Sequence, residues 1–171
     1  MVDIIILNFN QEADTTECIL SLKRMKRQDY RIILVDNGST DASGPGLKEK
    51  FRDVHFLRNE ENLGFAGGCN TGIRYSLKTS AADWLLLINN DTIAGEDLLD
   101  TLLDAARSRE DMGIAGAVNF YYSNPDKAHM AGHRFLWFLG IQRGVLALDA
   151  DVQELQSVSG CCMLIKKEVI Q

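Results

Sequence analysis

The sequence predicts an α/β fold in which a mostly parallel central sheet is flanked by helices on both faces. Short apolar runs rich in β-branched residues recur at residues 4–9, 31–36, 54–58 and 84–88, and segments with helical spacing separate them. Strands that alternate with helices in this way form βαβ units, in which neighbouring strands are parallel. The 171 residues are enough for one domain with a sizeable core.

The first two strands and the helix between them follow from the order of apolar residues. Residues 4–9 form an apolar run that only Asn8 interrupts, as expected for a strand that is buried on both faces. Cys18, Ile19 and Leu22 then recur at helical spacing, and the basic residues between 23 and 27 fit the solvated face and last turn of that helix. The second run ends in an Asn-Gly-Ser-Thr-Asp turn, which favours the start of a helix.

The next part of the chain repeats the pattern. A glycine-rich segment, residues 62–72, follows the third run and leads into a helix whose apolar side carries Cys69, Ile73 and Leu77. The fourth run ends in Asn-Asn-Asp-Thr, and leucines at helical spacing from residue 98 predict another helix. Residues 112–118 are predicted as a further strand.

The chain beyond residue 119 is less regular. Residues 121–126 have the composition of a turn-rich loop, and residues 135–139 are a short apolar segment. We interpret that segment as core, or as a hairpin packed on the domain, in preference to a membrane-surface patch. Residues 159–165 are predicted as a last strand. Residues 166–171 resemble the opening of a helix without a cap, which indicates a fragment of a longer protein.

Composition and charge exclude several classes of protein. The formal net charge of −6 argues against a nucleic-acid partner, because such binding relies on basic residues that neutralise phosphates. No apolar run reaches the roughly 18–20 residues that span a bilayer, and the first residues do not form a signal segment. The four cysteines form no CxxC pair, so neither a disulfide framework nor a zinc site is indicated. We expect a cytoplasmic protein, with peripheral contact at the inner face of the membrane left open.

Small polar residues follow each of the first four predicted strands. They are Asn8 and Asn10, Asp36 to Ser39, Asn59 and Asn62, and Asn89 to Asp91. The carboxyl ends of parallel strands meet at one edge of an open α/β sheet, where ligands bind. Taken singly, each group is an ordinary turn or helix cap, but four groups on one edge indicate a ligand site.

The common phosphate-binding loops do not occur in this sequence. The first connection from strand to helix contains no glycine, which excludes a dinucleotide-binding turn, and no Gly-Lys-Ser/Thr follows the glycines at 64–68. Two roles for these glycines stay open. One is close packing of a helix on the sheet, and the other is close approach of the backbone to a ligand at a helix N-terminus.

The charges at this edge of the sheet favour a metal ion. Arg58 is the only basic residue at a predicted strand end, so a bound diphosphate needs another cation. A divalent ion on Asp91 would supply it, because Mg²⁺ often binds through one or two carboxylates and the phosphates of a substrate. Asp36 is better suited to accept hydrogen bonds from a base or a ribose. Phe9 could pack against a base, and a core role is equally consistent.

Four motifs in this order resemble the nucleotide-sugar half of the family-two glycosyltransferases, which have the GT-A fold. The motifs are IIILNFN at residues 4–10, VDNGSTD at 35–41, NLGFAGGCNTG at 62–72 and LLINNDT at 86–92. The last two are most similar to the rhamnosyltransferase-like branch, which implies polysaccharide biosynthesis. The resemblance covers nearly the whole chain. We therefore expect a single GT-A domain over residues 1–171, with a Rossmann-like sheet, that is truncated before the acceptor-binding part.

The resemblance implies transfer of a sugar from a UDP- or dTDP-sugar to a glycan or lipid-linked acceptor, with inversion. The implied donor-binding residues lie at the strand ends and in the glycine-rich segment; they are Phe9, Asn10, Asp36, Asn62, Gly64, Asn70 and Asn90. Asp91 is implied as a ligand of Mg²⁺ or Mn²⁺. Asn89 stands where the family has the first aspartate of its Asp-x-Asp motif, and this amide keeps a coordinating oxygen but loses a charge.

No catalytic base is assigned from the sequence. In the family the base is an acidic residue on the acceptor side, downstream of residue 171, and Asp126 and Asp151 lie in segments without an anchor to the predicted site. One alternative is a non-catalytic nucleotide-sugar-binding module or degenerate relative. Another is a sugar nucleotidyltransferase, which the glycine-free first loop argues against.

Two further pairs of residues are interpreted without a functional role. His129 and His133 are four apart and could share a helix face as metal ligands, but a surface or core role is favoured because no Cys or Glu partner is near. Cys161 and Cys162 are interpreted as small residues on opposite faces of a strand rather than as a redox pair.

Overall fold

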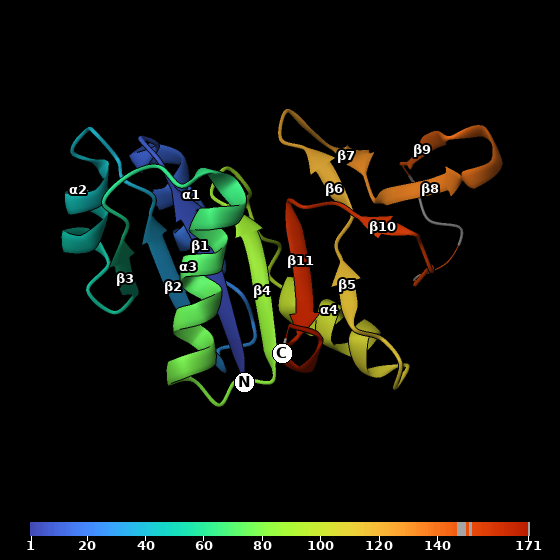
Figure 1. Ribbon diagram of the computed structural model, residues 1–171, viewed down its shortest axis with the longest axis horizontal. Helices are drawn as coiled ribbons and strands as arrows, with labels where there is room; N and C mark the ends of the chain where they lie inside the picture. The colour runs from blue at the N-terminus through green and yellow to red at the C-terminus, as the bar shows by residue number, and fades with distance from the viewer. Residues whose placement is uncertain (147–149, 151, 171) are drawn as a thin grey trace.

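The computed structural model of the chain describes residues 1–146, 150 and 152–170, and its centre is a six-stranded sheet (Figure 1). The order across the sheet is β3-β2-β1-β4-β11-β5. These strands are β1 (Val2–Asn8), β2 (Tyr30–Asp36), β3 (His55–Arg58), β4 (Trp84–Asn89), β5 (Ile114–Gly116) and β11 (Cys162–Lys166). The first four are parallel, and β11 runs antiparallel to both of its neighbours. The predicted α/β fold with a mostly parallel sheet is therefore confirmed.

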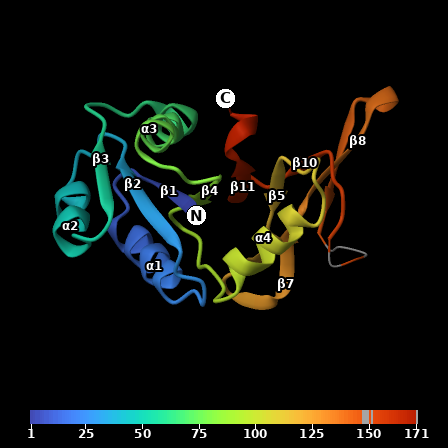
Figure 2. The same ribbon diagram turned by 90° about the horizontal axis from the view of Figure 1, so that it is seen from below.

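Helices cover both faces of the sheet, as Figure 2 shows. They are α1 (Glu12–Lys23), α2 (Ser43–Lys50), α3 (Gly64–Thr79) and α4 (Leu98–Arg107). Successive side chains of a strand point to opposite faces. Ile4 and Ile6 of β1 therefore pack with α1, α2 and α4 in the larger core, and Ile5 packs on the α3 side in the smaller one.

The order of the strands creates a switch point between β1 and β4. From β1 the chain proceeds outward to β2 and β3, and then returns through α3 to β4 on the other side of β1. Connections that leave in opposite directions diverge at the carboxyl ends of the two strands, and a crevice opens there. The fold therefore positions a site between the ends of β1 and β4.

Two glycines let α3 lie close against the sheet. A Cβ atom on Gly68 would come within 2.4 Å of Leu7 Cδ1, and one on Gly72 within 2.6 Å of Ile5 Cγ2. Close packing of a helix on the sheet is thus the role of these two positions. Gly64 is different, because it has φ +70° and open space where a side chain would be. A left-handed conformation of this kind favours glycine at the start of α3.

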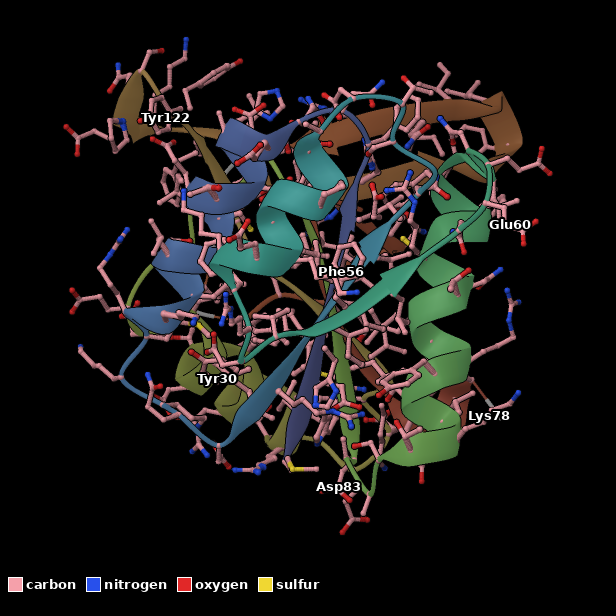
Figure 3. All side chains as sticks on the ribbon, turned by 90° about the vertical axis from the view of Figure 1, so that its left-hand side faces the viewer. Tyr30, Phe56, Glu60, Lys78, Asp83 and Tyr122 are labelled. Atoms are coloured by element: carbon pink, nitrogen blue, oxygen red, sulfur yellow. The ribbon has the colours of Figure 1, made fainter. Side chains whose placement is uncertain are left out.

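Figure 3 shows the β3 edge of the sheet, with α2 and α3 on either side of it. Glu60 and Lys78 point outward into solvent, whereas Phe56 and Tyr30 pack against the larger core. The basic segment predicted as one helical face is divided, because α1 ends at Lys23. None of the helices in the described residues combines the length and the hydropathy needed to cross a bilayer.

The predicted loop at residues 121–126 is largely wrong. Strands β6 (Asn119–Tyr121) and β7 (Asn124–Met130) form a two-stranded sheet, and the turn between them is only two residues long. Most of β7 is exposed and it contains Pro125, which lacks a backbone N–H. Such a strand shows no apolar alternation in sequence, and proline is tolerated because the strand lies at an edge.

The apolar segment at residues 135–139 forms part of a hairpin, but it does not lie in the core. Strand β8 (Gly132–Leu136) leads through a 3₁₀ helix, η1 (Trp137–Leu139), into β9 (Ile141–Val145), and β10 (Ser157–Val158) pairs with β8. The side chains of η1 are exposed. The prediction of a core segment is wrong because these strands pair with one another rather than with the central sheet.

The remaining elements differ from the predictions at their ends. The strand expected at 112–118 is limited to β5, and the one expected at 159–165 is β11, shifted toward the C-terminus. The predicted terminal helix begins as a short 3₁₀ helix, η2 (Lys167–Val169), and Gln171 lies outside the described residues.

Candidate functional site

A cleft of about 280 Å³ opens at the switch point, at the carboxyl ends of β1, β2 and β4 and beside the first turn of α3. Most of the residues predicted for the site meet there. The lining residues are Leu7, Phe9, Gln11, Asn37, Asn62, Gly64, Phe65, Asn89, Asn90 and Asp91. Asn37 and Asp91 come from opposite sides of β1 and face the same cleft, so the sequence-distant strand ends converge.

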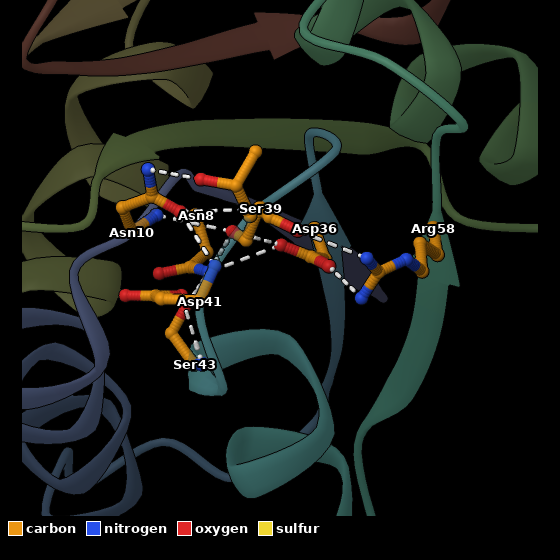
Figure 4. A network of polar contacts seen from close by, with 8 residues as sticks. Asn8, Asn10, Asp36, Ser39, Asp41, Ser43 and Arg58 are labelled. Carbon is orange, nitrogen blue, oxygen red and sulfur yellow. Dashed lines mark hydrogen bonds and ion pairs between the residues drawn. The ribbon is translucent and has the colours of Figure 1, made fainter.

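Asp36 does not line this cleft, because it is buried behind the strand ends in a network of polar contacts (Figure 4). Its Oδ1 accepts hydrogen bonds from Asn8 Nδ2 at 3.2 Å and from the Ser39 hydroxyl. Its Oδ2 accepts from Arg58 Nη1 at 2.8 Å. With both carboxylate oxygens occupied, the arrangement does not favour the predicted contact with a base or ribose. Asp36 instead fixes the loop after β2.

Arg58 is occupied by the same network. Its guanidinium pairs with Asp36 through Nη1 and donates from Nη2 to the Ser39 carbonyl at 2.9 Å. A hydrogen-bonded pair of this kind is the arrangement that allows a carboxylate to be buried. The one basic residue expected at a strand end is therefore not directed at the cleft.

Asn8 is the buried centre of the same network. Its Nδ2 lies within hydrogen-bond distance of Asp36, Ser39 and Ser43, and its Oδ1 accepts from the Thr15 hydroxyl at 2.9 Å. The side chain thus connects β1 to α1, to the loop after β2 and to α2. The sequence placed Asn8 at the edge of the sheet but contained no sign that it would be fully buried.

Asn10 joins two loops rather than lining the cleft. It adopts φ +55°, a conformation that asparagine tolerates better than most residues. Its Oδ1 accepts from the backbone N–H of Thr40 at 2.9 Å, and its Nδ2 donates to the Thr40 hydroxyl at 3.3 Å. Asn70, also predicted to bind the donor, is exposed on α3 and is not part of the cleft wall.

A chain of amides holds the loop that precedes α3. Asn37 Nδ2 donates to Asn62 Oδ1 at 2.9 Å and to the Gly64 carbonyl at 3.2 Å. Asn37 Oδ1 accepts from Asn59 Nδ2 at 2.9 Å and from the Leu63 backbone N–H at 3.2 Å. The Asn37 amide therefore has all of its hydrogen-bonding capacity used, and it positions the start of α3 at the cleft.

A second amide contact fixes the end of β4. Asn90 Nδ2 donates to Gln11 Oε1 at 3.1 Å and to the Thr15 hydroxyl at 3.0 Å. Both partners belong to the start of α1, so Asn90 joins the two sides of the switch point. Gln11 and Phe65 were not singled out from the sequence. Phe65 lies inside the glycine-rich motif, and its aromatic ring at the first turn of a helix was the available signal.

Two cleft residues, Asp91 and Asn89, have side chains that the hydrogen-bond networks of the described residues do not use. Among the described residues, neither side chain takes part in a hydrogen bond or ion pair, and both line the cleft. The pKa of the nearby Cys18 thiol is raised to about 12, mainly by burial and to a smaller extent by the charges of Cys162 and Asp91. Cys18 therefore stays neutral and protonated. Across residues 1–146, 150 and 152–170, no three His, Cys, Asp or Glu side chains form a preformed metal cluster.

The charge of the cleft is negative. Its lining residues include one carboxylate, Asp91, and no Lys or Arg. The positive end of the α3 helix dipole lies at Gly64, where the helix begins. This chemistry fits a divalent cation that is bound by Asp91, by the side-chain amide oxygen of Asn89 and by phosphate oxygens brought by a substrate.

A larger groove of about 1410 Å³ begins at Asp91 and extends away from the small cleft. It runs between α4, β5 and the β6–β7 hairpin, and its lining includes Phe120, Tyr121, His129 and Cys161. The ring of His129 packs edge-to-face on Tyr121, with 4.7 Å between ring centroids. Asp91 therefore stands at the junction of two open spaces.

The structure places the two members of each histidine and cysteine pair in different surroundings. His129 lies on β7 and His133 on β8, so they do not share a helix face. Cys162 begins β11 and is buried, whereas Cys161 precedes the strand and is partly exposed.

Of the two acidic residues considered as a catalytic base, the structure describes only Asp126. Asp126 is exposed on β7 and does not belong to the cleft wall. Asp151 lies outside the described residues.

The arrangement of the sheet defines an α/β protein with a cleft at the switch point, and comparison with known proteins identifies its family. The model of "Glycosyl transferase family 2" matches residues 3–171, and the chain belongs to this family. The resemblance inferred from the four motifs is confirmed.

A curated relative and two solved structures illustrate the similarity. The chain is 24% identical over 123 residues, 68% of its length, to N-acetylglucosaminyl-diphospho-decaprenol L-rhamnosyltransferase of Mycobacterium tuberculosis. Its fold matches the mannosyltransferase PcManGT of Pyrobaculum calidifontis in complex with GDP-Man and Mn²⁺, with TM-score 0.58 and 19% identity over 69% of the chain. It also matches S. aureus TarS in complex with UDP-GlcNAc, with TM-score 0.60 and 18% identity over 72% of the chain.

The chain spans a minor part of each of these proteins. The matched share is 40% of the rhamnosyltransferase, 35% of PcManGT and 36% of TarS. The solved structures, at these identities, establish the GT-A fold of the chain.

Proposed function

We propose that the chain binds the nucleoside diphosphate sugar donor of a glycosyltransferase, which moves the sugar to a glycan or lipid-linked acceptor with inversion. The observation that carries this proposal is the cleft at the switch point. It joins two aromatic rings, a helix N-terminus and the oxygen ligands of Asn89 and Asp91 in one space. Family membership supports the reaction class.

The aromatic residues of the cleft suit a nucleobase. Phe9 follows β1 and Phe65 lies in the first turn of α3, and both rings are partly exposed at the cleft. Large apolar side chains exposed inside a cleft offer flat surfaces on which a planar base can stack. The saturated amide of Asn37 and the buried carboxylate of Asp36 then position the walls instead of contacting the base. UDP and dTDP stay our preferred nucleotides.

The diphosphate would lie between the start of α3 and Asp91. The N-terminus of a helix favours an anion through its free backbone N–H groups and its dipole. Asp91 and Asn89 would hold Mg²⁺ or Mn²⁺ against the phosphates, and that ion would neutralise the charge that develops on the leaving diphosphate. Asn89 supplies a neutral oxygen, so one carboxylate of this chain carries the charge of the metal site.

The larger groove is the place for the acceptor in this proposal. It starts at Asp91, beside the position proposed for the diphosphate, and it is open over α4 and β5. Transfer with inversion requires a base that removes the proton of the acceptor hydroxyl. We assign that role to no residue of this chain, since Asp126 is exposed on β7 and lines neither the small cleft nor the larger groove.

Calorimetry with UDP, dTDP and GDP, each with and without Mg²⁺ or Mn²⁺, tests the donor site. We expect a diphosphate to bind at least tenfold more tightly with the metal, and Asp91→Ala to remove that gain. Asp104→Ala is the matched control, because Asp104 is an exposed carboxylate on α4 outside the small cleft. Binding that ignores both the metal and Asp91→Ala would overturn the metal part of the proposal.

Measurement of turnover distinguishes a glycosyltransferase from a non-catalytic nucleotide-sugar-binding module and from a sugar nucleotidyltransferase. Release of free sugar from a UDP- or dTDP-sugar, or its transfer to an added glycan, supports a glycosyltransferase. Binding without turnover, at every chain length that contains the acceptor side, would favour a nucleotide-sugar-binding module. Formation of a nucleotide sugar from a sugar phosphate and a nucleoside triphosphate would favour a nucleotidyltransferase.

A further inference from the structure

The hairpin formed by β8, η1 and β9 presents an apolar tip to solvent. Within η1, Trp137 is 76% exposed, Phe138 84% and Leu139 57%. In Figure 1 the hairpin extends away from the central sheet, with η1 at its far end. The Trp137 ring stacks on Phe135, with 5.3 Å between ring centroids, so it is held in place at the tip. Exposed apolar clusters of this kind mark an interaction site.

Two arginines lie directly behind the tip. Arg134 of β8 is paired with Arg143 of β9, and both are exposed. Neither forms an ion pair with any of the described residues. Like charges directly opposite each other destabilise a strand pair, so a bound anion would relieve this pair. Residues 127–146 contain no Asp or Glu, although the chain as a whole carries a formal charge of −6.

The order of these groups along the hairpin matches the polarity of a bilayer surface. The apolar groups are outermost. Arg134 and Arg143 lie two residues further back along their strands, on the same face of the hairpin as Leu136 and Ile141. Tryptophan favours the membrane–water interface, and arginine favours the level of the lipid phosphates. The tip is a narrow convex turn, which can enter a lipid surface without a complementary groove in the partner.

We propose that residues 136–141 insert into the interfacial region of a bilayer that contains anionic lipids, with Arg134 and Arg143 at the phosphate level. The occupant of this surface is therefore a lipid bilayer. The charge of the hairpin, opposite in sign to that of the chain as a whole, directs this end of the molecule toward an anionic surface. This inference does not depend on the proposed function, because it uses none of the residues of the small cleft.

The test uses vesicles of phosphatidylcholine alone and vesicles that also contain phosphatidylglycerol. The chain has two tryptophans, and Trp84 is buried in the core, so a change in emission on adding vesicles reports on Trp137. We expect a blue shift with the anionic vesicles and co-sedimentation of the chain. Trp137→Phe keeps an apolar ring at the tip, so it should abolish the shift while leaving co-sedimentation nearly unchanged.

Variants separate the roles of the tip and the arginines. Phe138→Ser should weaken binding to anionic vesicles at least tenfold. Tyr122→Ser is the matched control, because Tyr122 is equally exposed on the β6–β7 turn and should have no effect. Arg134→Gln and Arg143→Gln should each lower the coefficient for partition of the chain into anionic vesicles about fivefold. Added salt should also weaken the binding of the parent chain, because it screens the same attraction.

Several results would overturn the proposal. One is an unchanged Trp137 emission with both kinds of vesicle. Another is equal binding by Phe138→Ser and the parent chain, with far-UV circular dichroism showing that both are folded. Self-association that Phe138→Ser abolishes, without any binding to vesicles, would assign the tip to contact between two copies of the chain instead.

Discussion

The ion pair between Asp36 and Arg58 permits a worked prediction of stability. Arg58→Met keeps much of the aliphatic length but leaves the fully buried Asp36 carboxylate without a counter-charge. Removing one partner of a fully buried ion pair costs about 3–5 kcal/mol. Because the Arg58 side chain is 46% exposed and Asp36 keeps its bonds from Asn8 and Ser39, the loss should be smaller. We expect about 2 kcal/mol.

Urea unfolding followed by fluorescence measures this loss, with buried Trp84 as the reporter. For a chain of this length, about 2 kcal/mol corresponds to a fall in Tm of about 4–8 °C. Asp36→Asn introduced together with Arg58→Met removes the buried charge. The double variant should therefore be more stable than Arg58→Met alone, by about 1 kcal/mol.

The matched control lies at the opposite end of the sheet. Arg31 pairs with Asp3, which is fully buried, through Nη2 at 2.8 Å. We expect Arg31→Met to lower stability comparably, but only Arg58→Met to weaken nucleotide binding, because only its network borders the cleft. A loss below about 0.5 kcal/mol for Arg58→Met, the range of ordinary surface changes, would refute the reasoning. So would a double variant that is less stable than Arg58→Met.

Three further predictions concern buried thiols, helix packing and the cleft. Burial raises the pKa of the Cys18 and Cys162 thiols to about 12, so the unfolded chain loses these protons first as the pH rises above about 9. Stability should fall by about 1 kcal/mol per thiol at pH 10, and Cys18→Ala should flatten this dependence in urea titrations at pH 8 and 10. Gly68→Ala should cost about 1–3 kcal/mol by forcing α3 off the sheet, whereas Asn70→Ala on the exposed side should not destabilise; equal urea midpoints would contradict this. Phe65→Ala should weaken the binding of UDP or dTDP about tenfold in calorimetry, while the midpoint of urea unfolding stays unchanged. An unchanged affinity would exclude stacking of the base on this ring.

The central sheet could be predicted from the sequence because its strands are buried on both faces. Continuous β-branched runs such as the one in β1 are typical of buried strands, and the helical segments between them require parallel neighbours. The position of the site followed for the same reason. Once β1, β2 and β4 are parallel, Asn89 to Asp91 and the residues after β1 must lie at one edge.

The role of each polar residue at that edge could not be predicted as well. Asp36 and Asn37 are neighbours, yet the first points into the protein and the second lines the cleft. The difference depends on Arg58 of β3, which brings a counter-charge to Asp36 from a distant part of the sequence. Alternation along a strand predicts that the two side chains diverge, but it does not say which one is paired.

The second half of the chain was predicted least well for a related reason. Strands β6 to β10 are paired with one another and are mostly exposed, so they lack the apolar pattern that marked the central strands. The sequence of β11 did indicate a strand, but its antiparallel direction depends on the long connection that precedes it. The exposure of Trp137 and Phe138 likewise follows from what surrounds them, which a local pattern does not contain.

The insertion of β11 between β4 and β5 has a consequence for the order of assembly during synthesis. In the described residues, β5 is hydrogen-bonded to the sheet through β11 alone, although it precedes β11 by more than forty positions. A nascent chain that has not yet released β11 from the ribosome therefore exposes one edge of β4, a strand composed almost entirely of apolar residues. Unpaired apolar edges recruit other chains, so this interval is the point at which a folding helper would have the greatest effect on yield.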